Sequence, residues 1–358
     1  LGSQLMTTIA PNLKPVTLTS GRLPSWTTGI VLTVALLLSA TLFFATGSPG
    51  FIRILLVGTL IFAAVMMAAS LAVEGVRKAK DRLATITVTA AFGLALLPLV
   101  SLVISVIGKG SARFDLQFFT YSMRNVVGEG GGAVHAITGT LWVTGIATVI
   151  SVPIGILAAI YLVEYGTGSL ARSITFFVDV MTGIPSIVAG LFAYSLFVLF
   201  FGPGTKSGIA GAVALCVLMI PVVVRSIEEL LKIVPNELRE ASYALGVPKW
   251  LTIVKVVLPT AAAGIVTGVM LAVARVIGET APLLIAAGFT QSLNSNPLSG
   301  PMMTLPVFVY RSYVDQGNPA SAYLDRAWAG ALTLILIVMI LNLAGRLIAA
   351  KFAPKAGR

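Results

Sequence analysis

The chain has 358 residues, of which 57% are hydrophobic and only 10% are charged, and its mean hydropathy is +0.98. A soluble domain divides its residues more evenly between core and surface, so this composition excludes an ordinary soluble enzyme and indicates a membrane protein. The net charge of +11 does not indicate nucleic-acid binding, because the basic residues stand at the ends of apolar runs and form no patch with interleaved aromatics.

Eight stretches are long and apolar enough to cross a bilayer, which takes about 20 residues of helix. The predicted fold class is therefore an all-α integral membrane protein, a polytopic bundle of about eight transmembrane helices. In chain order the runs cover residues 27–46, 52–73, 84–107, 136–163, 173–201, 208–227, 260–288 and 328–350. The sequence contains no repeat of fixed period and no stretch suited to a soluble catalytic domain.

The N-terminal part has a polar lead followed by two apolar runs. Residues 1–25 are expected to be a cytoplasmic lead, in which residues 1–5 look like an added remnant ahead of a native start at Met6. Residues 26–83 are expected to hold two transmembrane helices. No convincing small-residue cleavage site follows the first of them, so we expect it to be retained.

The loops that carry clustered Lys and Arg all fall on one side of the predicted bundle. The positive-inside rule makes that side cytoplasmic and places both termini there. The opposite loops, at about residues 108–135 and 289–326, are long, rich in Gly, Pro, Asn and Ser, and poor in charge. The orientation rests mainly on Arg77, Lys78, Lys80, Arg82, Lys232, Arg239, Lys249, Lys255, Lys351, Lys355 and Arg358.

A charged segment at residues 228–259 separates the sixth and seventh runs and predicts a short helix of about nine residues. Pro235 and Asn236 form a start signal, Glu237 lies in the first turn where the helix dipole favours an acid, and Gly246 is a stop signal. One face of this helix is a small apolar strip suited to docking in a groove of another protein. The alternative is an amphipathic helix lying on lipid headgroups. The strip consists of Leu238, Ala241, Ser242 and Leu245.

The residue order in this segment resembles the coupling loop of the permeases of ATP-binding-cassette importers. That loop carries Glu-Ala-Ala, three further residues, Gly, and later an aliphatic-x-Leu-Pro ending. Here the matching positions are Glu240, Ala241, Ser242, Gly246, Val256, Leu258 and Pro259, with Ser242 and Val256 as mild departures. The resemblance implies that the helix seats in a cleft of a separate ATPase, with coupling carried by Glu240, Ala241, Ser242, Gly246, Leu238 and Leu245.

Four further segments narrow the resemblance to phosphate-specific permeases of the PstA type, with the PstC type as the nearest alternative. They are EGGGAVHAITGTL (129–141), TGIPSIVAGLFAY (182–194), LREASYALGVPKW (238–250) and ARVIGETAPLL (274–284). The resemblance implies a type I, MetI-like permease domain of six transmembrane helices at residues 84–358, with its coupling loop at 228–259. The first two helices would be additions of unexplained role.

The same resemblance implies a set of partners in a bacterial plasma membrane. They are a PstC-like sister permease that completes a phosphate pathway, a cytoplasmic PstB-like ATPase dimer, and an extracytoplasmic PstS-like phosphate-binding protein, besides membrane lipid. ATP and magnesium would belong to the ATPase, and this chain would bind no cofactor and would not be an enzyme. Consistently, residues 202–207 are the string closest to a Walker motif, and they lack the glycine before Lys206.

Other functions require features that the sequence lacks. A membrane enzyme would need clustered ligands or a nucleophile with a convergent base, and neither is present. An ion-driven secondary transporter would have no use for a coupling helix. A permease for another oxyanion stays open as an alternative substrate assignment.

Charged residues within the apolar runs are the candidates for the substrate pathway. Arg275 lies near the middle of the seventh run, where an arginine costs at least about 2.5–3.5 kcal/mol, and Glu279 follows one turn later on the predicted helix. An arginine fork suits a tetrahedral oxyanion, and the carboxylate could moderate its binding. The alternative is an ion pair that only fixes helix packing.

Two weaker candidates lie in the fifth and sixth runs. Arg225 ends the sixth run, where an arginine that reaches toward the membrane surface is unremarkable, although the resemblance places this position in the pathway. Asp179 lies about two turns into the fifth run and is expected either in the bundle interior or bonded to a neighbouring helix. His135 alone predicts no metal site. Gly130–Gly132 could present amides to an anion, but a flexible loop is the competing interpretation.

Overall fold

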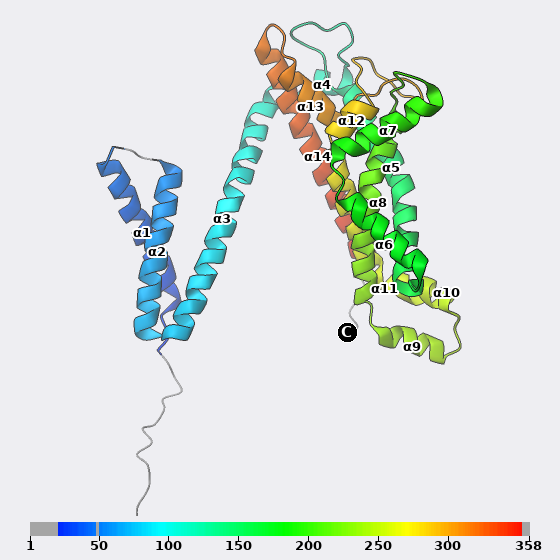
Figure 1. Cartoon of the computed structure of the whole chain (residues 1–358). Helices are drawn as coiled ribbons and strands as arrows, with labels where there is room; N and C mark the ends of the chain where they lie inside the picture. Colours follow the sequence, from blue (N-terminus) through cyan, green and yellow to red (C-terminus); the bar gives the residue numbers. More distant parts are fainter. Residues whose placement is uncertain (1–20, 48–49, 353–358) are drawn as a thin grey trace, which may run out of the picture. The chain divides into compact units, whose positions relative to one another are not determined.

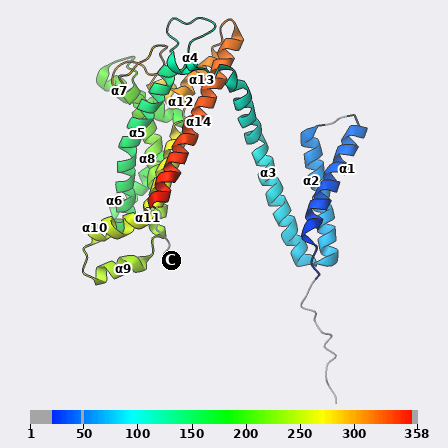
Figure 2. The same cartoon turned by 180° about the vertical axis from the view of Figure 1, so that it is seen from behind.

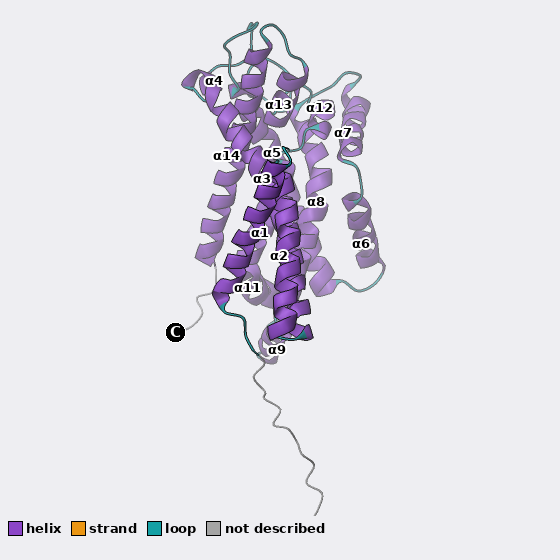
Figure 3. Ribbon diagram, turned by 90° about the vertical axis from the view of Figure 1, so that its left-hand side faces the viewer, coloured by secondary structure: helices purple, strands orange, loops and turns teal. Residues whose placement is uncertain are grey.

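The structure is a computed structural model that describes residues 21–47 and 50–352. The predicted remnant at residues 1–5 and most of the predicted lead lie outside the described residues. Within the described part, all regular structure is helical (Figure 3). Contacts divide the chain into two compact units, Leu1–Val103 and Ile104–Arg358, with the division inside one long helix.

The first unit is built on two apolar helices and most of a third. Helices α1 (Ser25–Ala45) and α2 (Phe51–Val73) pack along each other, and α3 (Val76–Gly110) follows after a short turn. Gly58 permits the close approach of α1, since a Cβ there would lie 2.7 Å from Leu36 Cδ2. At the turn, Glu74 accepts hydrogen bonds from Ser70 Oγ and from Arg82, which ties the start of α3 to the end of α2.

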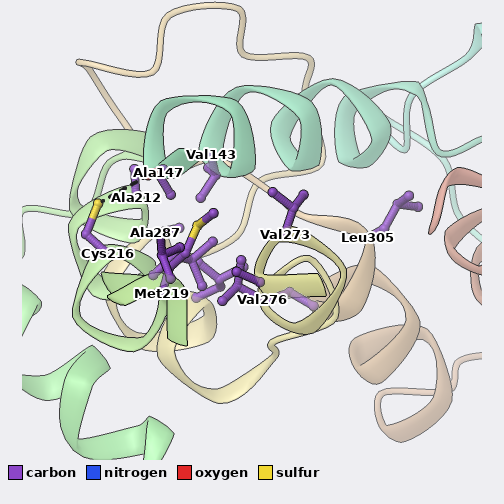
Figure 4. Packing of buried hydrophobic residues seen from close by; sticks show 14 of the residues in the cluster. Val143, Ala147, Ala212, Cys216, Met219, Val273, Val276, Ala287 and Leu305 are labelled. Carbon is purple, nitrogen blue, oxygen red and sulfur yellow. Dashed lines mark hydrogen bonds between the residues drawn. The ribbon is translucent and has the colours of Figure 1, made fainter. Parts of the chain in front are cut away.

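The second unit is a helical bundle in which α8 occupies the centre and packs against five other helices. Its long helices are α5 (Val134–Ile160), α8 (Gly208–Ile233), α11 (Leu258–Val276) and α14 (Ala320–Phe352). Small and medium side chains fill the contact between α5, α8 and α11, among them Val143, Cys216 and Val276 (Figure 4). Small residues let helix backbones approach closely in a membrane, where the hydrophobic effect does not drive helix association.

Shorter helices connect these four. They are η1 (Ser111–Arg113), α4 (Leu116–Thr120), the π-helical η2 (Tyr161–Tyr165), α6 (Ser169–Thr182), α7 (Ser186–Phe201), α9 (Asn236–Ala244), α10 (Lys249–Thr252), the π-helical η3 (Ile253–Val257), α12 (Ala281–Ala286) and α13 (Leu305–Val314). Seven helices of the described chain are long and apolar enough to cross a membrane, and the number rises to eight if one bent pair is a single span. The predicted multi-pass helical bundle is confirmed.

The bent pair corrects the fifth predicted span. Residues 173–201 were expected to form one helix, but α6 and α7 meet at a bend of 110°. Figure 1 shows the two helices running in different directions. Pro185 is the physical reason, because its ring disfavours a helical conformation at Ile184 and it has no N–H for a continuous helix. The C-terminal ends of α5 and α8 both adjoin α9 at one end of the bundle (Figures 1 and 2). Because α8 ends on the α9 side, it begins at the opposite end of the bundle. The segment from the end of α5 to the start of α8 must therefore cross the bundle, and it does so on α6 and α7 together.

The seventh predicted span also ends earlier than expected. Residues 260–288 were expected to form one helix, but α11 ends at Val276 and the short α12 begins only at Ala281. Pro282 lies in the first turn of α12, where its missing N–H is tolerated, and it could not continue α11 without a clash with the carbonyl of Gly278. Arg275 thus lies at the end of a helix and not in its middle.

Candidate functional site

The predicted short helix in the charged loop is confirmed as α9, nine residues long from Asn236 to Ala244. Its end is the predicted glycine stop. Gly246 has a φ of +75°, which a glycine adopts without strain. The amide of Gly246 donates to the carbonyl of Tyr243 at 2.9 Å, and the amide of Val247 donates to that of Ser242 at 3.2 Å. These bonds satisfy carbonyls that the helix end leaves open.

Most of the predicted docking strip is exposed on α9. Leu245 is 84% exposed and Leu238 is 41% exposed, and Ala241 and Glu240 are exposed beside them. Ser242 is the exception and corrects the predicted strip. It is buried, and its Oγ lies 2.8 Å from Thr252 Oγ1. Ser242 therefore fastens α9 to α10 within the chain, and the exposed apolar surface consists of Leu238, Ala241 and Leu245.

A buried ion pair fastens α9 to the end of α5. Arg239 Nη2 lies 2.9 Å from Glu164 Oε1, and the two side chains are 11% and 5% exposed. The same guanidinium donates to the carbonyls of Val234 at 2.6 Å and Leu231 at 3.0 Å, where α8 ends. A free helix of nine residues is unstable in water. Arg239 therefore sets the position of α9 on α5 and α8.

A second basic residue strengthens this junction. Lys249 Nζ donates to the backbone carbonyl of Glu164, and its ammonium lies 4.8 Å from the centre of the Tyr165 ring. Glu164 and Tyr165 belong to η2, where the wider π-helical turn alters the backbone hydrogen bonding. Sequence reasoning missed both contacts, because Glu164 precedes Arg239 by 75 residues and no local pattern links them.

The structure brings two of the predicted pathway residues together. Arg225 on α8 forms an ion pair with Asp179 on α6 and a second one with Glu228, at 2.8 Å. Glu228 also binds Lys232 at 2.7 Å. The four side chains form a chain of alternating charge, which we call the α6–α8 charge cluster. Arg225 is therefore bonded within the bundle and is more than an arginine at the membrane surface, and Asp179 bonds to a neighbouring helix as one prediction stated.

Arg275 and Glu279 are not joined in the same way. The predicted ion pair between them is wrong: α11 ends between the two residues, and no salt bridge links them in the described part of the chain. The amide of Glu279 instead donates to the carbonyl of Val276 in a turn, at 3.1 Å. Arg275 is exposed on the surface of this chain, and Glu279 is half-buried. An arginine without an acidic neighbour at a helix end is free to bind an anion supplied from outside the chain.

Comparison with known proteins places this arrangement in a family. Residues 151–358 match the family described as binding-protein-dependent transport system inner membrane component. The chain is 48% identical over 275 residues to "Phosphate transport system permease protein PstA 1" of Mycobacterium tuberculosis, a match that covers 76% of this chain and 89% of the relative. It is 40% identical over 280 residues to "Phosphate transport system permease protein PstA" of Yersinia pestis, covering 77% and 92%.

Among solved structures, the chain is similar to an inward-facing form of the MetNI methionine ABC transporter. The identity is 21%, the TM-score is 0.48, and the match covers 62% of this chain and 94% of that one. The family match extends over more than half of the sequence, and the similar proteins from Mycobacterium and Yersinia are matched over most of their length. The chain is therefore a multi-pass membrane protein that belongs to the binding-protein-dependent transport system inner membrane components, in the branch of the PstA permeases.

Proposed function

We propose that this chain is a permease subunit of an ATP-driven phosphate importer. The observation that carries the proposal is α9, a helix at one end of the bundle that exposes Leu238 and Leu245 while Arg239 fastens it to two spanning helices. Such a helix can receive a push from a partner and pass it to α5 and α8. The names of the similar proteins support phosphate as the substrate.

The partners follow from this role. A cytoplasmic ATPase dimer of the PstB type binds ATP and magnesium and receives α9. A PstC-like sister permease completes the pathway, and a PstS-like protein delivers phosphate at the opposite face. The positive-inside rule supports a cytoplasmic position for α9 and both termini in a bacterial plasma membrane. The division into two additional helices at residues 26–83 and a permease domain at residues 84–358 stays a prediction.

The charged residues divide between two tasks in this proposal. Arg275 and Glu279 lie at the break between α11 and α12 and contact phosphate in the shared pathway, since no salt bridge engages Arg275 among the residues that the structure describes. Arg225 and Asp179 belong to the α6–α8 charge cluster, which links α6 to α8 on the side of α9. Their ion pair breaks or re-forms as α6 and α8 move. Its role is therefore in opening and closing the pathway more than in binding phosphate.

The central test is uptake in reconstituted vesicles that contain the four kinds of subunit. Phosphate should enter only with ATP, and uptake should fall when Glu240→Lys alters the exposed side of α9 while assembly of the two permeases is kept. Sulfate should not compete at equal concentration. Uptake driven by an ion gradient without ATP would refute the importer, and preferred uptake of sulfate would assign the chain to another oxyanion.

Arg275→Gln tests the pathway assignment. A charge-assisted hydrogen bond contributes about 1.5–3 kcal/mol, so phosphate uptake should fall roughly ten- to a hundredfold. Arg346→Gln is the matched control. Arg346 is also an exposed arginine on a spanning helix, but it lies near the C-terminal end of α14 and not at the break between α11 and α12. Equal uptake by Arg275→Gln and the control, with intact assembly, would leave Arg275 without a role in the pathway.

A further inference from the structure

A small cavity lies at the end of the second unit opposite α9, where α5 and α14 begin. Its volume is about 290 Å3, several times the roughly 30 Å3 that one water occupies. The lining residues come from the loops at this end, from α13 and from the first turns of α5 and α14, and we call the cavity the outer pocket. Its charged and titratable lining residues are His135, Arg311, Asp315, Tyr323 and Arg326.

Arg326 is the unusual feature of the outer pocket. It is only 1% exposed, yet no carboxylate forms an ion pair with it in the described chain. Its Nη1 donates to the carbonyls of Gly128 at 2.7 Å and Gly130 at 2.9 Å, whereas Nε and Nη2 have no hydrogen-bond partner. The guanidinium also lies 4.5 Å from the centre of the Tyr323 ring, which compensates part of its charge. A buried charge without an opposite charge is nevertheless expensive, so the two unbonded nitrogens favour an anionic partner.

His135, at the start of α5, gives an independent indication from another part of the lining. Its ring is 1% exposed and lies edge-on to Phe308, with 5.6 Å between ring centres, and neither Nδ1 nor Nε2 has a hydrogen-bond partner among the described residues. A buried imidazole normally has at least one partner. Both Arg326 and His135 therefore offer unused donor positions to the same cavity.

The remaining charges of the outer pocket nearly cancel. Arg311 Nη2 lies 2.7 Å from Asp315 Oδ2, and its guanidinium stacks 3.6 Å above the centre of the Phe289 ring. Asp315 is thus already paired with Arg311, which leaves the positive charge of Arg326 unbalanced among the described lining residues. The loop that contains Gly128, Gly130 and Gly131 is held in place beside Arg326, since Arg113 Nη2 donates to the carbonyl of Gly131 at 2.7 Å.

The geometry points to a binding site in the outer pocket for a small oxyanion of the phosphate class, held by Nε and Nη2 of Arg326 and by the ring of His135. Parallel N–H groups of a guanidinium match two oxygens of such an ion. The choice of phosphate rests on the proposed function. The site lies on the face opposite α9, where it receives the ion before the ion reaches Arg275.

The test is a titration of the purified full chain with inorganic phosphate by calorimetry, in a phosphate-free maltoside detergent and again in phospholipid nanodiscs. One saturable site per chain is expected, and Arg326→Gln should weaken it on the order of tenfold or more. Arg124→Gln is the matched control, since it removes one exposed positive charge from the same outer loop. His135→Leu should weaken binding several-fold.

Several results would overturn the site. These are the absence of saturable binding in the wild type, unchanged affinity in a folded Arg326→Gln variant, and loss of binding in Arg275→Gln but not in Arg326→Gln. If Arg326→Gln does not fold, unchanged affinity in His135→Leu is decisive against the site. Affinity that disappears in nanodiscs would mean that a lipid headgroup holds the outer pocket, which refutes a free ion.

The proposed function fails separately, through the vesicle assay. A chain that binds phosphate in the outer pocket but supports no ATP-driven uptake would refute the importer and keep the site. Uptake that is normal in Arg326→Gln, together with lost binding at the outer pocket, would keep the importer and show that the site is dispensable for transport.

Discussion

Two arginines with little exposed surface lie at opposite ends of the second unit, and they differ in how they are partnered. Arg239 at the α9 end binds Glu164 and two carbonyls at the end of α8, so its charge is neutralised and its donors are used. Arg326 in the outer pocket binds two carbonyls and no acid, and two of its nitrogens have no partner. The fully partnered arginine fixes structure, whereas the half-partnered one is the residue that we propose to hold an oxyanion.

The largest effect on stability is expected when Arg239 no longer holds α9 against Glu164. Arg239→Met leaves Glu164 buried without its partner, which should destabilise the chain by about 3–5 kcal/mol. Thermal and denaturant unfolding in detergent would measure this. The double variant Arg239→Met, Glu164→Leu is the control and should recover much of the loss, because no unpaired charge remains. A double variant no more stable than the single one would mean that the carbonyl contacts, and not the ion pair, hold α9.

The next effect should appear in association with the ATPase and not in stability. Leu245→Glu places a charge on the exposed strip, and loss of a buried leucine contact of about 1.5–3 kcal/mol weakens association roughly ten- to a hundredfold. Co-purification and binding kinetics with the ATPase would measure it. Leu298→Glu is the matched control, an exposed leucine in an outer loop. Equal association of the two variants would remove Leu245 from the docking surface.

Substitutions of Gly246 test whether the positive φ at the end of α9 is needed for stability and for transport. No atom lies within 4 Å of a Cβ added at this position, so only the positive φ opposes a substitution. Gly246→Val should therefore cost about 1–3 kcal/mol through backbone strain alone. Gly246→Asn should be milder, since asparagine tolerates this conformation. Unfolding and ATP-driven uptake should rank the variants in that order, and equal values would mean that the turn relaxes without cost.

The smallest effect concerns another arginine–acid contact, between Arg82 and Glu74 in the first unit. Hydrogen bonds from Arg82 and from the amide of Leu23 lower the pKa of Glu74 from 4.5 to about 2. A lowered folded-state pKa stabilises the fold above the unfolded value, so this contribution should disappear as the pH falls from about 4.5 toward 2. Thermal unfolding against pH should show a slope in this window that Glu74→Gln lacks. An identical slope in both proteins would assign it to other carboxylates.

The sequence predicted the helices better than their contacts. Apolar length fixes where a helix can span, and start and stop signals fixed α9 almost to the residue. The bend at Pro185 and the end of α11 were missed, although Pro185 and Pro282 mark them, because unbroken hydropathy outweighed the prolines. The length of an apolar run alone does not predict whether the backbone stays helical throughout the bilayer.

The contacts of the charged residues depend on packing between distant segments. Arg225 meets Asp179 across 46 residues, Arg239 meets Glu164 across 75, and Arg326 meets Gly128 across 198. No periodic pattern connects such positions. The wrong ion pair between Arg275 and Glu279 shows the converse, since a helical spacing of four implies a contact only where the helix continues through both residues.

The bend between α6 and α7 limits how motion can spread through the bundle. A continuous helix turns as one rod, whereas a break of three residues lets its two halves rotate independently. Asp179 ties α6 to Arg225 of α8, whereas α7 packs on α12, through the close contact of Gly190 with Pro282, as well as on α8. If α8 tilts at its α9 end, α6 should therefore tilt with it, and the movement should not pass beyond the break that begins at Gly183. If α9 moves with a partner ATPase, as proposed, the bend would let α6 follow that movement while α7 keeps its place against α12.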